Sequence, residues 1–454
     1  MINTTENRAT TAKVMALGLL LAALMAASLL AASQARASTT FTVNSTEDHS
    51  DAILTVGACD TGYLVTRPGG EQEAECTLRA AMEQANHTPG ADTINFAIPG
   101  SGVKTISPTS PLPNMTEALT INGYSQPGAQ PNQKAVGSDA VLKVELSGAN
   151  APSSGAVGLR IGASNSTVKG LVVNRWSDTG IYISGSGTTG NKVTGNFVGT
   201  DASGTQKLGN YYGVWVYGAP NTTIGGTTPA ERNVISANDG PGVLIQLAAA
   251  KGNGVVGNYI GTDRNGTAAL GNGQTGVWVY DAPNTTIGGT RAGERNVISA
   301  NGANGVWING DSSTTGNRIL SNSIFSNGGQ GIDLGYVGPT ANDPGDTDTG
   351  PNGLQNKPVL SSARNADGKT TVRGKLNSSP NRTFKVQFFS NPSGTDEGKV
   401  FIGQKSVTTD GSGNATFAFS PAQKVALGRT ITATATSPGG STSEFSAART
   451  VISA

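Results

Sequence analysis

Residues 213–238 read GVWVYGAPNTTIGGTTPAERNVISAN, and almost the same letters return as GVWVYDAPNTTIGGTRAGERNVISAN at residues 276–301. The offset between the two copies is 276 − 213 = 63 residues. A second pair of segments, GNFVGTDASGTQKLGN from Gly195 and GNYIGTDRNGTAALGN from Gly257, alternates with them. Self-similarity of this kind indicates a repeat architecture, in which each unit buries its apolar face against its neighbours.

Each repeat contains about three short runs of β-type alternation, such as GVWVY, TTIGG and RNVISAN, separated by Gly, Asn and Pro turns. Three strands and three turns in one repeat predict one coil of a parallel β-helix. Helical repeats are excluded, because no long window between residues 158 and 335 has an apolar stripe of helical period free of Gly or Asn. The first strand of successive coils begins after a glycine, at Gly158, Gly180, Gly213, Gly242, Gly276, Gly305 and Gly331.

Alternation along this first strand separates an inner from an outer set of side chains. The inner positions are aliphatic, as in Val214 and Val216. The outer positions carry aromatic residues where a solvated sheet carries Thr and Lys. The candidate carbohydrate-binding residues are therefore Tyr182, Trp215, Tyr217, Trp278, Tyr280 and Trp307. Trp215 and Trp278, two coils apart, would lie roughly 10 Å apart, near the repeat of two sugars. The alternative is that the rings cover the sheet against a long turn or the C-terminal domain.

Asparagine recurs at five-residue spacing in the predicted turns. Its amide tolerates left-handed turns and can bond the equivalent amide one coil away, so we predict structural ladders. The members are Asn191, Asn196, Asn233, Asn238, Asn253, Asn258, Asn296, Asn301, Asn317 and Asn322.

Residues 1–37 have the pattern of a secretory signal peptide, with basic residues, an apolar run and an Ala-x-Ala site; an uncleaved membrane anchor is the alternative. Residues 38–90 form an expected N-terminal cap. Its Cys59 and Cys76 are the two cysteines of the chain and are expected to form a disulfide in an exported protein. A short amphipathic helix after Cys76 would close the open end of the β-helix.

The segment CTLRAAMEQAN at residues 76–86 resembles the cap signature of CSLREA-type bacterial surface proteins, with Thr77 and Ala80 in place of the Ser and Glu of that name. The GNxIGTD and NTTIGG repeats resemble the right-handed parallel β-helix that follows such caps, a pectate-lyase-like fold. The resemblance implies an all-β fold and an extracellular address, secreted or at the cell surface. It implies an activity much less firmly, because fold does not determine function.

We assign residues 91–336 to the parallel β-helix, 337–357 to an acidic Gly/Pro linker and 358–454 to an immunoglobulin-like β-sandwich. In the linker, Asp343, Asp346 and Asp348 lie within six residues and are candidate calcium ligands; a solvated acidic linker is the alternative. The predicted protein requires no cofactor, and calcium is the one possible bound ion.

The charge balance argues against a nucleic-acid partner. The chain has 31 basic and 30 acidic side chains, and removal of residues 1–37 leaves 31 − 3 = 28 and 30 − 1 = 29. Phosphate binding requires a concentrated basic patch, which the sequence lacks. We also expect no membrane insertion after signal cleavage, and a monomer.

The catalytic residues, if any, are unknown from the sequence. Acidic candidates such as Asp201, Asp263, Glu231 and Glu294 occur in duplicate, and both histidines lie in the cap. We therefore predict a non-catalytic protein that binds a polysaccharide or a cell-surface glycan. The alternative is a polysaccharide lyase or glycoside hydrolase that acts on an acidic polysaccharide.

Overall fold

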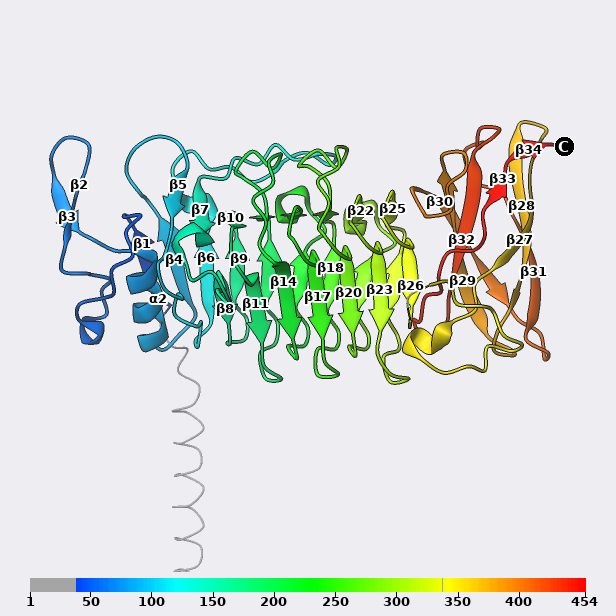
Figure 1. Cartoon of the computed structure of the whole chain (residues 1–454), viewed down its shortest axis with the longest axis horizontal. Coiled ribbons are helices and arrows are strands. Elements are labelled where there is room, and N and C mark those ends of the chain that lie inside the picture. The colour runs from blue at the N-terminus through cyan, green and yellow to red at the C-terminus, as the bar shows by residue number, and fades with distance from the viewer. Residues whose placement is uncertain (1–37, 337) are drawn as a thin grey trace, which may run out of the picture.

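The computed structural model describes residues 38–336 and 338–454, so the expected signal peptide lies outside the described residues. Figure 1 shows an elongated molecule in which a cap, a stack of coils and a two-sheet domain follow one another. The chain forms a right-handed parallel β-helix, as predicted, and a C-terminal β-sandwich.

The described part of the chain has three parallel sheets, one for each side of the coil. The nine-stranded sheet contains β1 (Thr40–Val43), β4 (Asp92–Phe96), β6 (Leu119–Asn122), β9 (Thr167–Lys169), β12 (Lys192–Thr194), β15 (Thr223–Gly225), β18 (Gly254–Val256), β21 (Thr286–Gly288) and β24 (Arg318–Leu320). The eight-stranded sheet contains β5 (Lys104–Ile106), β7 (Val144–Ser147), β10 (Leu171–Asn174), β13 (Phe197–Val198), β16 (Val234–Ile235), β19 (Tyr259–Ile260), β22 (Val297–Ser299) and β25 (Ser323–Phe325). The seven-stranded sheet contains β8 (Leu159–Ile161), β11 (Thr179–Ser184), β14 (Tyr212–Tyr217), β17 (Val243–Gln246), β20 (Val277–Tyr280), β23 (Val306–Asn309) and β26 (Ile332–Leu334).

The aliphatic side chains assigned to the inside fill the coil. In the seven-stranded sheet Val214 pairs with Val243, and Val243 pairs with Val277, in one register column. These side chains are fully buried. Burial of each stabilises the fold by roughly 1.5–3 kcal/mol.

Asparagine amides run along two corners of the coil as hydrogen-bonded ladders. In the first ladder the Nδ2 of each residue donates to the Oδ1 of the next, at 2.9–3.3 Å, through Asn196, Asn233, Asn258, Asn296 and Asn322. The second ladder does the same at 2.9 Å through Asn210, Asn238, Asn272, Asn301 and Asn327. Because the donor and acceptor of each amide are used, both ladders are satisfied although they are buried.

Asn191, Asn253 and Asn317, which the five-residue spacing assigns to the ladders, do not belong to them. They lie in a third column, where they alternate with Thr222 and Thr285. The Oδ1 of each accepts a backbone N–H of the preceding coil, at 2.7–2.8 Å. Threonine has no side-chain amide, so it cannot continue a chain of amide-to-amide hydrogen bonds. This column is therefore not an amide ladder.

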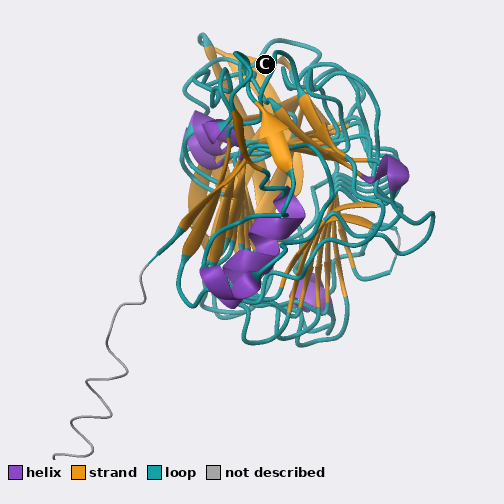
Figure 2. Cartoon of the chain, turned by 90° about the vertical axis from the view of Figure 1, so that its left-hand side faces the viewer, coloured by secondary structure: helices purple, strands orange, loops and turns teal. Residues whose placement is uncertain are grey.

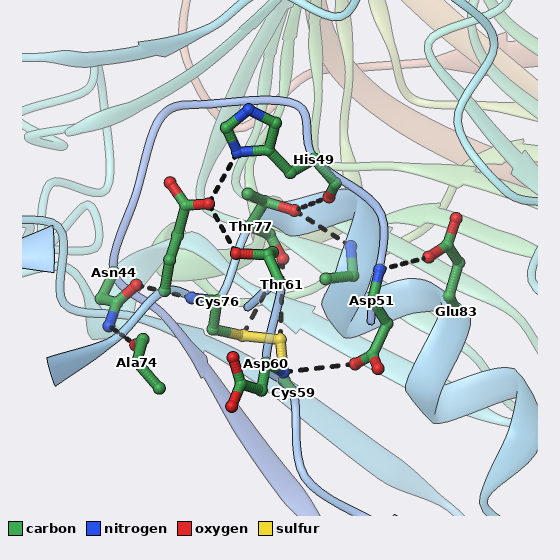
Figure 3. The surroundings of a disulfide bond; sticks show 12 residues. Asn44, His49, Asp51, Cys59, Asp60, Thr61, Ala74, Cys76, Thr77 and Glu83 are labelled. Carbon is green, nitrogen blue, oxygen red and sulfur yellow. Dashed lines mark hydrogen bonds and ion pairs between the residues drawn. A yellow bond between two sulfur atoms is a disulfide. The ribbon is translucent and has the colours of Figure 1, made fainter. Parts of the chain in front are cut away.

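The N-terminal cap shares the first sheet of the coil. Strand β1 pairs in parallel with β4, so the sheet begins before residue 91, the predicted start of the β-helix. Helix α2 (Leu78–His87) lies across the open end of the coil (Figure 2), and its Leu78, Ala81 and Met82 join the main core. A small hairpin of β2 (Leu64–Thr66) and β3 (Gln72–Ala74) extends beyond it. The predicted disulfide between Cys59 and Cys76 is present (Figure 3), confirming that expectation.

The C-terminal domain consists of two mostly antiparallel sheets that pack around a second core. One sheet contains β27 (Val359–Ala366), β28 (Lys369–Asn377), β31 (Asn414–Phe419) and β34 (Ile452–Ser453). The other contains β29 (Thr383–Asn391), β30 (Val400–Thr408), β32 (Thr430–Thr436) and β33 (Arg449–Thr450). The sandwich architecture is therefore confirmed, whereas its immunoglobulin-like identity stays a prediction.

The sandwich is docked on the last coil of the β-helix. Ile324 and Gly398 exchange two backbone hydrogen bonds of 2.9 Å. The second asparagine ladder ends on Glu397, whose Oε1 accepts from Asn327 Nδ2 at 3.0 Å. The sandwich thus covers the strand edge that a β-helix leaves open at its end. The remaining described helical segments are short: the 3-10 turns η1 (Leu54–Val56), η2 (Gly123–Ser125), η3 (Gly148–Asn150), η4 (Pro229–Glu231) and η5 (Ala292–Glu294), and the kinked η6 (Pro351–Leu354).

Candidate functional site

The outer face of the seven-stranded sheet carries a column of aromatic side chains. The strand register aligns Arg160, Tyr182, Trp215, Leu244, Trp278, Trp307 and Asp333, one from each coil. A neighbouring column contains Tyr217 and Tyr280. Parallel pairing therefore brings the six candidate carbohydrate-binding residues onto one face, in two clusters separated by the buried Leu244.

The first cluster, the Trp215 cluster, contains Tyr182, Tyr212, Trp215 and Tyr217. The ring centroids of Tyr182, Tyr212 and Tyr217 lie 5.1, 5.0 and 5.7 Å from that of Trp215. The Arg160 guanidinium stands 4.7 Å from the centre of the Tyr182 ring. Burial raises the pKa of the Tyr182 and Tyr212 hydroxyls further above physiological pH, so both stay neutral.

The second cluster, the Trp278 cluster, contains Trp278, Tyr280 and Trp307. The rings of Trp278 and Trp307 are stacked, with centroids 4.9 Å apart and planes 15° from parallel. Rings in this geometry overlap face to face. The two indole rings therefore lie face to face, and each covers one face of the other.

The indole N–H groups of the face differ in their partners. Trp307 Nε1 donates to the Gly335 carbonyl at 2.9 Å. The Nε1 atoms of Trp215 and Trp278 are buried, and no acceptor lies within reach of either among the described residues. An unpaired buried donor costs about 1–3 kcal/mol of stability.

A groove of about 1070 Å³ lies at the end of the Trp278 cluster. Its walls are the turns after β20 and β23, with Tyr280, Asp281 and Asp311, and the linker around η6, the yellow helical turn beside β26 in Figure 1. Tyr336, also on the wall, is 95% exposed. The aromatic face therefore runs into an open depression that is large enough for a sugar unit.

The outer faces of the other two sheets differ from this one. The long loop at residues 126–143 covers part of the eight-stranded sheet: Ala140 and Leu142 pack on Val172, Phe197 and Val234. On the nine-stranded sheet, the outward register column contains Lys192, Thr223 and Thr286, as an ordinary solvated sheet does.

The duplicated acidic residues serve their own turns. Asp201 Oδ1 accepts from the backbone N–H of Thr205 and Gln206, and Asp263 Oδ1 accepts in the same way from Thr267 and Ala268. Glu231 accepts from the N–H of Thr228 in a capping box. These carboxylates stabilise repeated turns, as their duplication indicated.

Asp343, Asp346 and Asp348 are brought together by the linker, with one carboxylate oxygen from each within 4.8 Å of the others. Asp343 Oδ2 accepts from the N–H and hydroxyl of Thr347, both at 2.8 Å. Asp346 accepts from Asn356 N, Gln355 Nε2 and the Ser378 hydroxyl. The Oδ1 atoms of Asp343 and Asp348 are buried without a hydrogen-bond partner among the described residues. Burial, together with the neighbouring Asp343 and Asp346, raises the pKa of Asp348.

Sequence reasoning missed several residues of these sites. Tyr212 and Arg160 belong to the Trp215 cluster, and Asp281, Asp311 and Tyr336 line the groove. Asp281 immediately follows Tyr280 and occupies the turn after the strand, at φ 55°. The sequence could have placed Asp281 at the site, because it directly follows Tyr280 and the turns after successive parallel strands lie at one edge of the sheet.

The match to a family model supports the β-helix fold. A family described as a right-handed β-helix region matches residues 144–340. No curated protein matches the chain. Among solved structures, it is similar to the tailspike protein gp49 from Acinetobacter baumannii bacteriophage Fri1, a capsular polysaccharide depolymerase. That likeness has 9% identity and a TM-score of 0.17, and covers 79% of this chain and 69% of the other. The fold and the family match define the class of this chain, a right-handed parallel β-helix protein.

Proposed function

We propose that this protein binds a polysaccharide or cell-surface glycan, without cleaving it, along the aromatic face and groove. The observation that carries the proposal is the contrast between the three sides of one coil. One side is polar, one is covered by the loop at residues 126–143, and one carries seven aromatic rings that lead into a groove. Sugar rings bind aromatic side chains through their apolar C–H faces, while hydroxyls meet polar groups at the rim.

The alternative is that the aromatic rings are structural and only shield the sheet beneath another segment of the chain. In that case a long turn or the C-terminal domain would pack on them. The long loop packs on the eight-stranded sheet instead, and the sandwich docks on the end of the coil. In Figure 1 the strands of the seven-stranded sheet face the viewer. Trp215, Trp278 and Trp307 are half-buried and Tyr217 is exposed, so part of the face is accessible to a partner.

Catalysis by a lyase or hydrolase is the second candidate, and the acidic residues favour it less. Hydrolysis requires a convergent pair of carboxylates, and elimination requires a base beside a group that neutralises the substrate carboxylate. Asp201, Asp263 and Glu231 are engaged by their own turns. Asp281 and Asp311 line the groove without a basic neighbour among its described lining residues.

An extracellular location is part of the proposal. The disulfide between Cys59 and Cys76 supports an oxidising compartment. No helix in the described residues has both the length and the apolar character that a bilayer span requires. The CSLREA-type assignment, secretion, the monomeric state and the lack of a nucleic-acid partner stay predictions.

Calcium binding by Asp343, Asp346 and Asp348 also stays a proposal, supported by the two buried unpaired oxygens. Calcium prefers such clusters of carboxylate oxygens. Because the same linker forms a wall of the groove, a bound cation would stiffen that wall.

The proposed function is tested by mixing residues 38–454 with insoluble or high-molecular-weight polysaccharides. Co-sedimentation and release of soluble fragments are followed together. We expect co-sedimentation without fragment release. Release of fragments, particularly ones with unsaturated ends, would contradict the non-catalytic proposal and favour the enzyme alternative.

A further inference from the structure

The described lining of the groove has charges of one sign. Asp281 and Asp311 line it, and no Lys or Arg is among its described lining residues. Neither carboxylate forms an ion pair with a described residue. The cation of the aromatic face, Arg160, lies over Tyr182 in the Trp215 cluster, and its strand β8 is four coils away from β20.

Both carboxylates accept hydrogen bonds from the turns that follow β20 and β23. Asp281 Oδ1 accepts from the backbone N–H of Asp311 at 3.3 Å. Asp311 Oδ1 accepts from the N–H and the hydroxyl of Ser313, at 2.7 and 2.6 Å. The Ser313 bonds hold the pKa of Asp311 below its usual range. The groove therefore presents fixed negative charge beside the Tyr280 ring.

We infer that the groove selects a neutral or amino sugar and rejects a uronic acid, with Asp281 and Asp311 as the specificity-determining residues. This inference rests on the proposed glycan-binding function. Sugar hydroxyls and ammonium groups are donors, and their hydrogen bonds to carboxylates are stronger than those between neutral groups. A uronate carboxylate is an acceptor of the same charge, and placing it beside these groups is unfavourable.

The inference narrows the choice of ligand that the fold leaves open. It points away from acidic polysaccharides such as polyuronates, the substrate class of the lyase alternative. It also assigns the discrimination between sugars to the turns that carry Asp281 and Asp311. The aromatic rings do not discriminate in this way, because they stack on any sugar of suitable shape.

The test compares the affinity of the protein for galactomannan, chitosan and polygalacturonate at pH 6, in EDTA so that no divalent cation bridges two carboxylates. We expect galactomannan or chitosan to bind at least ~10-fold more tightly than polygalacturonate. In the variant Asp281→Asn/Asp311→Asn we expect that ratio to fall to about 3-fold or less, because polygalacturonate gains affinity. Asparagine keeps the Oδ1 acceptor that each turn uses.

Asp367→Asn is the matched control, because Asp367 is an exposed aspartate with a left-handed φ of 49° in a turn of the sandwich. It should leave the ratio unchanged. Tightest binding of polygalacturonate by the wild type, or the same ratio in the double variant, would overturn the inference while leaving glycan binding intact. Failure of the wild type to bind any of these or other polysaccharides would overturn the proposed function as well.

Discussion

The indole rings of Trp278 and Trp307 stack on one another, with centroids 4.9 Å apart and planes 15° from parallel. The two residues are register partners in neighbouring strands, which in a sheet lie about 4.8 Å apart. The spacing of the coil therefore sets the stacking distance of the rings. A ligand can reach only the faces and edges that the pair leaves open, so the two rings act as one unit.

This arrangement predicts non-additive effects on glycan binding. Trp278→Ala and Trp307→Ala should each raise the Kd about 5–30-fold, because removal of one ring also frees its partner to move. The double variant should raise the Kd by much less than the product of the two single-variant increases. Isothermal titration with the tightest-binding polysaccharide provides the Kd values. Tyr63→Ala, an exposed aromatic in the cap, is the control; fully multiplicative effects would argue against the coupled pair.

The first asparagine ladder predicts a large loss of stability from a single amide. Asn258 donates to Asn296 and to the Ile224 carbonyl and accepts from Asn233. Asn258→Ala removes these three buried hydrogen bonds and should lower the free energy of unfolding by about 3 kcal/mol. Asn150→Ala, on an exposed residue, is the control. Denaturant titration followed by circular dichroism measures both, and equal midpoints would refute the structural role of the ladder.

Calcium should stabilise the protein through Asp343 and Asp348. Calcium at ~100 times its Kd would add about 2.7 kcal/mol to the free energy of unfolding. Magnesium, which demands stricter coordination geometry, should add less. Thermal unfolding in calcium and in EDTA measures the difference. The variant Asp343→Asn/Asp348→Asn should lose the calcium response, whereas Asp367→Asn should keep it. A calcium response that survives in the double variant would place the cation elsewhere.

Asp333 should make stability depend on pH. It is fully buried, and that burial raises its pKa to about 6, with Glu444 adding to the rise and Asn304 and Lys357 opposing it. Between pH ~4 and ~6 the folded protein then binds more protons than the unfolded chain, so stability falls as pH rises, by on the order of 2 kcal/mol.

The comparison of wild type with Asp333→Asn isolates this contribution, since Asp346, Asp348 and Glu397 also have raised pKa values. Unfolding free energies at pH 4.5 and 7.5 should differ less in the variant. An unchanged difference would mean that Asp333 does not titrate in this range. Asp311→Asn should act in the opposite direction, because the pKa of Asp311 is lowered.

The repeat pattern was sufficient to predict the coil. Period-two alternation distinguishes Val214 and Val216 from Trp215, and a parallel register then stacks equivalent residues. The ladders were less predictable from spacing. Asn210, Asn272 and Asn327 belong to the second ladder, but they lie outside the five-residue pairs that we used. Coil membership depends on turn lengths, which vary between coils.

The candidate site was predictable only in part. Alternation places the aromatic residues on one outer face, but ring orientation depends on packing between coils, which the sequence does not contain. The groove depends on the linker returning beside Asp281 and Asp311, a contact between segments far apart in the chain. The docking of the sandwich through Gln387 and Glu397 was missed for the same reason.

Tryptophan fluorescence during polysaccharide titration tests the central claim most directly. Of the four tryptophans, Trp215, Trp278 and Trp307 lie on the aromatic face and Trp176 is buried in the core. The account predicts a saturable change in emission with the same midpoint as co-sedimentation, and its loss in Trp278→Ala/Trp307→Ala. Co-sedimentation with no change in emission would place binding away from this face and contradict the account.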